Sequence, residues 1–381
     1  MIYLDNAATT QTAPEVLEAM LPYFTEKYGN PSTIYALGSQ NKKVINDAKR
    51  TIADTIGGKM EEIYFTSGGT ESDNWAIKGV AEGYREKGKH IITTRIEHHA
   101  VLHTCEYLEK QGYQVTYLDV DRQGLVSPEA VKKAIRPDTI LISIMFANNE
   151  IGTIQPIAEI GAIAKAKGIL FHTDAVQAYG PLDIRVDDMG IDLLSASGHK
   201  IYGPKGVGFL YVRTGVKLPS FIHGGGQERG RRAGTENVPA ITGLAKAAQL
   251  AVVNRKIMVA KEKELRDYLI TKLLAEIPDC KINGCIKENR LPNNVNISFP
   301  GIEGESLLIM LDMRGICAAS GSACTAGATE PSHVLTAIGL SQAEANGSLR
   351  LTLSAQNTVE ELDETVVAIK EIVERLRSFR I

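Results

Sequence analysis

The sequence predicts an α/β fold, in which a mostly parallel sheet of seven strands is covered by helices on both faces and followed by a smaller α+β unit. Three observations support this prediction. Short apolar runs alternate with longer helical stretches up to about residue 255, as βαβ units require. The length of 381 residues suggests two domains, or one large domain with a smaller one appended, at roughly 100–200 residues per domain. After residue 255 the pattern changes to a charged helix and isolated strand-like runs.

The large unit contains seven runs with the length and composition of buried strands. They are expected at Ile63–Thr66, His90–Arg95, Gln114–Val120, Thr139–Phe146, Ile169–Thr173, Asp192–Ser195 and Gly208–Val212. Helices are predicted between most of them. One carries an apolar stripe of Val101, Cys105 and Leu108, and another is the Ala-rich segment 240–254. Both are expected to cover the sheet.

The smaller unit begins with a charged helix near 256–275. Strand-like runs follow at NVNISF (294–299) and LRLTLS (349–354). The last helix is predicted to start at a capping box formed by Thr358 and Glu361, and to continue with an apolar face that packs on this unit.

Composition excludes several classes of protein. The chain is 44% hydrophobic with a net charge of −3, so it has material for a core and no basic surplus that would favour nucleic acid or an anionic membrane. The most apolar stretch, Ile140 to Ala147, is too short to cross a bilayer. The start MIYLDNAATT lacks the pattern of a secretory signal, and five cysteines do not suggest a disulfide framework. A cytoplasmic location is expected.

The segment FTSGGTESDN (65–74) leaves a predicted strand and enters a helix near Thr70. Small residues and backbone N–H groups at a helix N-terminus suit a phosphate. A tight turn with an N-cap explains Gly68, Gly69 and Thr70 equally well. The chain has no GxxxxGK[ST] loop and no convincing GxGxxG after a first strand, which disfavours ATP and NAD.

Polar side chains follow two further predicted strands, where ligands bind in open α/β sheets. Asp174 and Gln177 follow one strand, and Ser197, His199 and Lys200 follow the next. A carboxylate can hold a pyridinium nitrogen while a lysine forms a Schiff base with an aldehyde on the same ring, as pyridoxal phosphate requires. Taken singly, Asp174 could be a helix N-cap and Lys200 a solvated lysine. Together with the phosphate-like loop they favour this cofactor.

Seven strings resemble the NifS/IscS-type cysteine desulfurases, in the order found in that family and across nearly the whole chain. They are YLDNAATT, FTSGGTES, NNEIGTIQP, HTDAVQ, SGHKIYGPKGVG, HGGGQERGRRAGT and SGSACTAGATEPSHVL. The resemblance implies a class V aminotransferase-like, fold-type I enzyme dependent on pyridoxal 5′-phosphate. It also implies a homodimer whose large domain, 15–255, binds the cofactor, and whose small domain combines 1–14 with 256–381.

The resemblance assigns roles to individual residues. Lys200 would be the Schiff-base lysine, Asp174 the partner of the ring nitrogen and Gln177 that of the phenolate oxygen. His98 would stack on the ring and shuttle protons. The phosphate would be held by Gly69, Thr70, Ser197 and His199, with Thr235 reaching in from the other subunit. Asn149 and Arg350 would hold the substrate carboxylate, for which a guanidinium fork is suited, although a surface position for Arg350 stays open. Asn149 would also be one of the cofactor-binding residues.

Cys324 is the expected nucleophile. It lies in SGSACTAGAT, where Gly, Ser and Ala favour a loop of about residues 318–331 rather than a packed element. The resemblance implies that its thiolate takes sulfur from L-cysteine as a persulfide and releases L-alanine. Core packing is the default for Cys105 and Cys317. Zinc at Cys280 and Cys285 is improbable, because no second pair exists.

Two other groups of residues leave alternatives open. Arg229, Arg231 and Arg232 could form a local anion site or an exposed loop. A metal pair at His99 and His103, spaced i, i+4, is disfavoured because no third ligand is near, and no metal is expected.

The predicted function is cysteine desulfuration, with sulfur delivered to a protein acceptor that is an iron–sulfur scaffold or a tRNA-thiolating enzyme. A selenocysteine lyase or another class V aminotransferase is the alternative within the fold. An aminotransferase has no need of the loop cysteine. A non-catalytic sulfur-relay or scaffold protein is the alternative from another class, and such a protein has no use for Lys200, Asp174 and His98.

Overall fold

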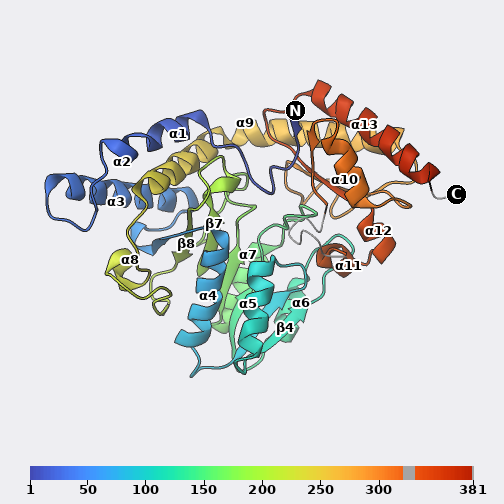
Figure 1. Ribbon diagram of the computed structural model, residues 1–381. Helices are drawn as coiled ribbons and strands as arrows, with labels where there is room; N and C mark the ends of the chain where they lie inside the picture. Colours follow the sequence, from blue (N-terminus) through green and yellow to red (C-terminus); the bar gives the residue numbers. More distant parts are fainter. Residues whose placement is uncertain (321–330, 380–381) are drawn as a thin grey trace.

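The computed structural model describes residues 1–320 and 331–379, and its largest element is a seven-stranded sheet (Figure 1). Only β8 runs opposite to the other six strands, so the sheet is mainly parallel, as predicted. Across the sheet the order is β2 (Ile63–Thr66), β8 (Gly208–Val212), β7 (Leu193–Ser197), β6 (Leu170–Asp174), β5 (Thr139–Ser143), β3 (His90–Thr94) and β4 (Gln114–Leu118).

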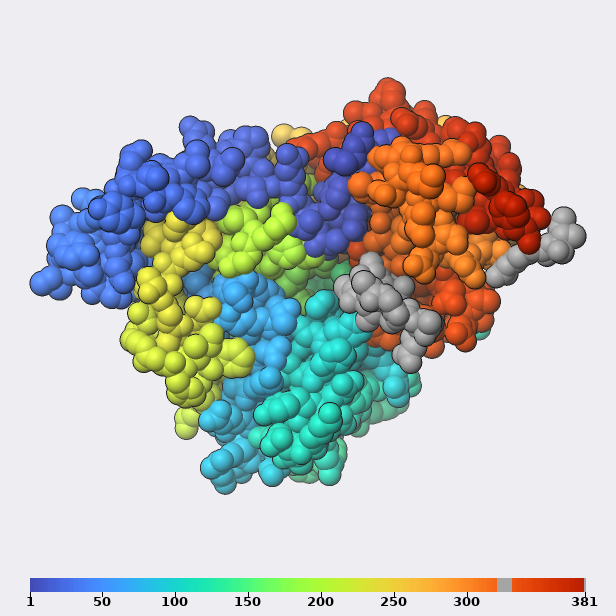
Figure 2. Space-filling model, in the orientation of Figure 1, coloured from blue at the N-terminus to red at the C-terminus, as the bar shows by residue number. Residues whose placement is uncertain are grey.

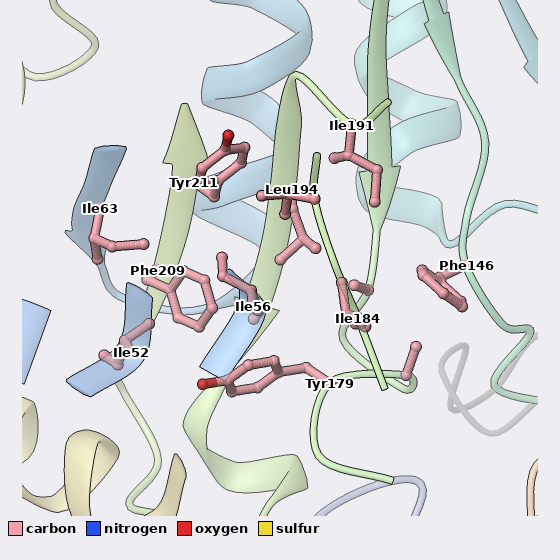
Figure 3. Packing of buried hydrophobic residues seen from close by; sticks show 14 of the residues in the cluster. Ile52, Ile56, Ile63, Phe146, Tyr179, Ile184, Ile191, Leu194, Phe209 and Tyr211 are labelled. Atoms are coloured by element: carbon pink, nitrogen blue, oxygen red, sulfur yellow. The ribbon is translucent and has the colours of Figure 1, made fainter. Parts of the chain in front are cut away.

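Helices cover both faces because residues alternate between the two faces along each strand. One face packs on α4 (Gly69–Gly83) and α5 (His99–Glu109), whose apolar stripe of Val101, Cys105 and Leu108 is buried as predicted. The other face packs on α3 (Ala36–Ile56), α6 (Pro128–Ala134), α7 (Ile157–Lys167) and the first half of α9 (Val238–Glu276). Figure 3 shows the core on this face of the large sheet, where Ile52 and Ile56 of α3 lie near Phe209.

A second hydrophobic core lies in the C-terminal part of the chain. Its antiparallel sheet has the order β12 (Ser348–Thr352), β10 (Asn294–Ser298) and β9 (Lys281–Ile282). The helices α10 (Gly304–Asp312) and α13 (Val359–Ser378) pack on it with the second half of α9. Both predicted strand-like runs are confirmed. The predicted capping box is also present, because Thr358 Oγ1 accepts from the Glu361 N–H while Glu361 accepts from the Thr358 N–H.

The N-terminal residues belong to this second core. The strand β1 (Ile2–Tyr3) pairs in parallel with β11 (Ile316–Cys317), and Leu4 is fully buried among the C-terminal helices. Residues after β1 then run back toward the large sheet, so the N-terminal segment lies between the two parts of the molecule (Figure 2).

The sequence predicted that one helix ends and another begins near residue 255, and this prediction is wrong. The Ala-rich segment and the charged segment form one helix, α9, of 39 residues. Its first half contributes to the core under the large sheet and its second half to the C-terminal core, while Val253 and Ile257 between them are exposed. The composition changes because the surroundings of the helix change, not because the helix ends.

Several predicted strand ends were also inaccurate. β3, β4 and β5 end earlier than expected, at Thr94, Leu118 and Ser143, while β6 and β7 extend to Asp174 and Ser197. The apolar residues after β5 continue into a buried loop, so hydrophobicity alone could not locate the end of the strand.

The remaining helices are short. They are α1 (Pro14–Met20), α2 (Pro22–Thr25), α8 (Gln227–Gly230), α11 (His333–Ala337), α12 (Gln342–Asn346) and the 3-10 turns η1 (Met60–Glu62) and η2 (Gly198–Lys200). Within the ranges described, no helix has both the length and the apolar character that crossing a membrane would need.

Candidate active site

A cavity of about 290 Å³ opens beyond the carboxyl ends of β6 and β7. The predicted residues that line it are Gly69, Thr70, His98, Asn149, Asp174, Gln177, Ser197, His199, Lys200 and Arg350. Sequence analysis missed the other lining residues, which are Ala7, Ala8, Asp73, Met145, Ala147 and Val176. The cavity therefore gathers residues from segments far apart in the sequence.

One end of the cavity is the N-terminus of α4. The loop after β2 passes through Gly68, whose φ of 150° is seldom adopted by other residues. A Cβ atom at Gly69 would lie 2.6 Å from Val176 Cγ2, so only glycine lets the helix start this close to the end of β6. Thr70 lies inside the first turn, and within the described residues no side chain caps α4. The N–H groups of this turn therefore face the cavity end without a side-chain cap, as an anion site requires.

Asp174 forms part of the cavity wall at the end of β6. Its Oδ1 accepts a hydrogen bond of 2.9 Å from the Val176 N–H. Burial raises the pKa of Asp174 to about 6, against the opposing effects of the Val176 hydrogen bond and the charge of Lys200. The carboxyl group is therefore largely ionised at neutral pH and can pair with a cationic ring nitrogen.

Lys200 ends the short turn η2 that follows β7. Its Nζ donates hydrogen bonds of 2.6 Å to the carbonyl oxygens of both Ala7 and Ala8. Gln177 Nε2 donates to the same Ala7 oxygen over 3.0 Å. The N-terminal segment, residues 7–10, thus forms a strap across Lys200, and we keep that name for it below.

The strap is also fixed to His199. The Thr10 N–H donates to the His199 carbonyl oxygen over 2.9 Å, and His199 Nδ1 lies 3.1 Å from Thr9 Oγ1. Burial lowers the pKa of His199 to about 4, and the nearby charges of Lys200 and Lys205 add to this effect. His199 is therefore a neutral hydrogen-bonding group at physiological pH.

His98 lies four residues after the end of β3 and is the N-cap of α5. Its Nδ1 accepts a hydrogen bond of 3.1 Å from the Ala100 N–H, so this nitrogen carries no proton. Burial lowers the pKa of His98 to about 4, helped by neighbouring histidines and Lys200. The capping bond fixes the ring at the cavity edge in its neutral form.

Arg350 extends into the cavity from β12 of the C-terminal part. Its guanidinium donates to Asp5 Oδ1 over 2.8 Å and to the Asn149 carbonyl oxygen over 3.2 Å. Arg350 Nε is buried and has no hydrogen-bond partner among the described residues. A buried, positioned guanidinium with an unused donor is suited to bind a carboxylate.

Two predicted site residues remain to be considered. Cys324 lies outside the described residues, so its predicted role stays a prediction. Thr235 is exposed in the loop before α9 and, in the described part of the chain, does not line the cavity. This position leaves untested its predicted contact with the phosphate of another subunit.

The three arginines of the Gly-rich segment bind other parts of the chain. Arg232 forms an ion pair with Glu71 of α4, with nitrogen–oxygen distances of 2.8 and 3.1 Å. Arg231 donates to the Tyr64 hydroxyl over 2.8 Å, and the Arg229 guanidinium lies 4.1 Å from the centre of the same ring. These contacts attach the segment to α4 and β2.

The structure also bears on the suggested metal pair at His99 and His103 and on the expected core packing of Cys105 and Cys317. The rings of His99 and His103 stack with centroids 5.0 Å apart, yet no group of three metal-binding side chains suited to a metal ion occurs in residues 1–320 and 331–379. Cys105 is buried, as expected, and burial raises the pKa of its thiol. Cys317, expected in the core, is only half-buried in β11.

The cavity fits pyridoxal 5′-phosphate. It has a carboxylate for a ring nitrogen at Asp174, a primary amine at Lys200 and, at Gly69, a helix N-terminus without a side-chain cap for a phosphate. The Arg350 guanidinium, which lines the same cavity, supplies a cationic donor group for a carboxylate beside them. Fold and cavity together are those of a fold-type I enzyme that uses this cofactor.

The chain belongs to the aminotransferase class-V family, whose model matches residues 2–365. It is 58% identical over 377 residues to a protein of Methanosarcina thermophila named "Cysteine desulfurase IscS", covering 99% of this chain and 93% of that one. Among solved structures, a "NIFS-LIKE PROTEIN" is 40% identical with a TM-score of 0.92 and coverages of 98% and 99%. "SspA in complex with cysteine" is 42% identical with a TM-score of 0.83, covering 94% of this chain and 100% of that one.

Proposed function

We propose that this protein is a cysteine desulfurase that converts L-cysteine to L-alanine and receives the sulfur on Cys324. The observation that carries the proposal is that one cavity combines Lys200 and Asp174, suited to the cofactor, with Arg350, suited to an amino-acid carboxylate. The full-length similarity to a protein named cysteine desulfurase supports the same activity.

Each cavity residue has a proposed task. Pyridoxal phosphate supplies an electron-accepting ring that weakens bonds at the substrate α- and β-carbons. Asp174 would pair with the ring nitrogen, Lys200 would bond the aldehyde carbon and later move protons, and His98 would cover the ring. The phenolate oxygen would be held by Gln177, and the phosphate by Gly69, Thr70, Ser197 and His199.

Substrate recognition is assigned to Arg350 and Asn149. The Arg350 guanidinium would bind the substrate carboxylate, and Asp5 and the Asn149 carbonyl oxygen keep it in place. Asn149 lines the same cavity, and its side-chain amide would assist. This arrangement orients the substrate β-carbon and its thiol relative to the ring.

Sulfur transfer requires a thiol nucleophile, and the described residues that line the cavity include no cysteine. We assign this role to Cys324, whose thiolate would attack the substrate sulfur. The substrate carbon–sulfur bond breaks, a sulfur–sulfur bond forms on Cys324, and the β-carbon takes a proton to become the methyl group of alanine. The product is one persulfide and one alanine for each cysteine.

The two hydrophobic cores support the proposed division of the chain. Residues 15–255 would form the cofactor domain, and residues 1–14 with 256–381 the small domain that carries the loop of about 318–331. The pairing of β1 with β11 attaches the N-terminal strand to the small domain. The boundary near 255 would fall within the continuous helix α9.

A homodimer is proposed because Thr235 does not line this chain's own cavity in the described residues and would complete the site of a second copy. Large apolar side chains left exposed on the described chain offer a surface for it. They include Leu17, Leu21, Phe24, Tyr28, Ile34 and Tyr35.

The persulfide needs an acceptor, which we propose to be a protein that builds iron–sulfur clusters or thiolates tRNA. A cytoplasmic location is part of the same proposal. The free thiols of Cys105, Cys280, Cys285 and Cys317 fit a reducing compartment.

The proposal is tested by incubating purified protein with pyridoxal phosphate, L-cysteine and a reductant, and measuring alanine and sulfide together with the cofactor absorbance. We expect equal amounts of both products. Cys324→Ser should keep the cofactor band and lose sulfide formation by at least about 100-fold, since hydroxyl cannot replace a thiolate nucleophile.

Cys280→Ser is the matched control and should keep wild-type rates, because Cys280 lies in the C-terminal core away from the cavity. A cofactor band without alanine would favour a sibling aminotransferase. Preference for selenocysteine would favour a lyase, and failure to bind the cofactor would favour a sulfur-relay protein.

A further inference from the structure

Asp73 is a buried acidic residue in the cavity wall, and the proposed function gives it no role. It lies on α4 one turn beyond Gly69, is 1% exposed and lines the same cavity as Asp174. Its Oδ1 is completely buried and has no hydrogen-bond partner among the residues described. An ionised carboxylate in such a place would need a cation, because burial of an unpaired charge is costly.

The only described ion-pair contact of Asp73 is with His172, whose Nε2 lies 3.6 Å from Asp73 Oδ1. His172 is itself fully buried, and its ring nitrogens lie 2.8 Å from Ser143 Oγ and 3.0 Å from Ser195 Oγ. Burial lowers the pKa of His172 to about 3, so the ring is neutral. His172 therefore provides no positive charge for Asp73.

Two buried carboxyl groups thus share one wall of the cavity, and mutual repulsion favours one proton between them. Asp174 has the better support for a negative charge, from the Val176 N–H and the charge of Lys200. Burial and the charges of Asp174 and Glu97 hold the pKa of Asp73 well above the ordinary range, and the nearby Ser195 hydroxyl opposes this rise only in part. The proton of the pair therefore belongs to Asp73.

We propose that Asp73 is a positioning residue that stays protonated behind Asp174, so that Asp174 alone is charged when the cofactor ring binds. This inference rests on the proposed function, because it assigns Asp174 to the ring nitrogen. A neutral Asp73 keeps one negative charge opposite one cationic nitrogen. An ionised Asp73 would add a second charge and raise the proton affinity of Asp174.

The direct test is infrared spectroscopy of the cofactor-loaded protein near neutral pH. A protonated carboxyl group has a carbonyl stretch separate from the carboxylate bands, so the difference between wild type and Asp73→Asn should show the loss of one such stretch. Asp363→Asn is the matched control, because Asp363 is paired with Lys272 at 2.7 Å and its pKa is lowered. That variant should lose carboxylate bands only. Loss of carboxylate bands in Asp73→Asn would overturn the proposal.

Cofactor binding gives a second readout. An amide mimics a neutral acid, so Asp73→Asn should bind pyridoxal phosphate within about threefold of wild type, and the pH midpoint of the bound-cofactor absorbance should shift by less than about half a unit. Removal of a real charge beside the ring would instead change affinity by about tenfold or more for each pKa unit of interaction. That result would also overturn the proposal.

If Asp73→Asn does not fold, wild-type protein labelled with ¹³C at aspartate carboxyls answers the question by NMR. One resonance should keep the protonated shift at about pH 8, well above the ordinary aspartate value of about 3.9. Absence of such a resonance would contradict the proposal. Failure of the proposed function is distinguishable, since it would appear as missing alanine while the carboxyl signal of Asp73 persists.

Discussion

Asp5 illustrates how a single residue prepares the substrate site. Its carboxylate accepts a hydrogen bond of 2.8 Å from Arg350, and the side chains of the pair are 20% and 5% exposed. Asp5 thus connects the N-terminal segment to β12 of the C-terminal part. We expect it to act through Arg350 rather than on the substrate.

Asp5→Asn should therefore raise KM for L-cysteine about tenfold with a smaller change in kcat, because a charge-assisted hydrogen bond contributes about 1.5–3 kcal/mol. Steady-state kinetics of alanine formation checks this prediction. Asp119→Asn is the control, since it removes an Arg–Asp pair of similar length, 2.7 Å, from the exposed surface. A fall in kcat at unchanged KM would contradict the positioning role.

The sequence was informative about residues with distinctive chemistry and uninformative about their supports. The sequence located three residues that line the cavity, because each stands at or just after the end of a strand-like run or a quoted motif. They are Lys200, Asp174 and Arg350. Ala7 and Ala8 contribute only their backbone carbonyl oxygens. Because every residue has such an oxygen, the residue type gives no indication of this role. Asp73 stood in a quoted motif, one turn beyond Gly69, and helical spacing could have placed both on one face.

At the scale of elements, strands were easier to predict than their ends. Seven apolar runs identified all seven strands of the large sheet, because buried parallel strands are continuously hydrophobic. The continuity of α9 was missed, because one helix crosses from one core to another and carries two different patterns. The spacing of apolar residues along a helix depends on what the helix packs against, so a change in that spacing does not show that the helix ends.

The cap of α13 gives a prediction at this scale. Thr358→Ala removes the hydroxyl that accepts from the Glu361 N–H and should lower the free energy of unfolding by about 1 kcal/mol. Urea denaturation measures the change. Thr271→Ala, in the interior of α9 where the hydroxyl bonds to the Asp267 carbonyl, should be neutral or slightly stabilising. Equal losses in both variants would argue against a capping effect.

At the scale of the whole molecule, stability should depend on the ionisation of Glu262. This carboxyl group is 5% exposed on α9, and burial raises its pKa to about 8 despite a backbone hydrogen bond from Ala355. The folded protein binds a proton there that the unfolded chain releases near pH 4.5. The resulting stability is complete below that pH and is lost as pH rises toward 8.

Glu262→Gln should flatten this dependence by up to about 1.4 kcal/mol per pH unit between pH 4.5 and 8. The measurement is the free energy of unfolding in urea at several pH values. Glu264→Gln is the control, because its side chain is 73% exposed two residues further along the same helix. Parallel pH profiles for wild type and Glu262→Gln would refute the prediction.

Assembly is the other property at this scale. Replacing both Leu21 and Phe24 by Asp places two charges among exposed apolar side chains and should convert the proposed dimer to a monomer. Analytical ultracentrifugation measures the mass. Phe379→Asp changes a ring that is even more exposed, near the other end of the chain, and should leave the dimer intact. A monomeric wild type would contradict the dimer proposal.

The attachment of the N-terminal strand to the C-terminal core also determines the order of events during synthesis. Ala7 donates to Thr352 Oγ1, a residue 345 positions further along the chain. On the ribosome, β1 emerges first but can pair with β11 only after residue 317 has been made, whereas Gln177, His199 and Lys200, which also bind the strap, are made much earlier. The large sheet can form earlier from its local βαβ units. The strap can thus meet Lys200 early, but its attachment to Thr352 and the arrival of Arg350 at the cavity are among the last steps.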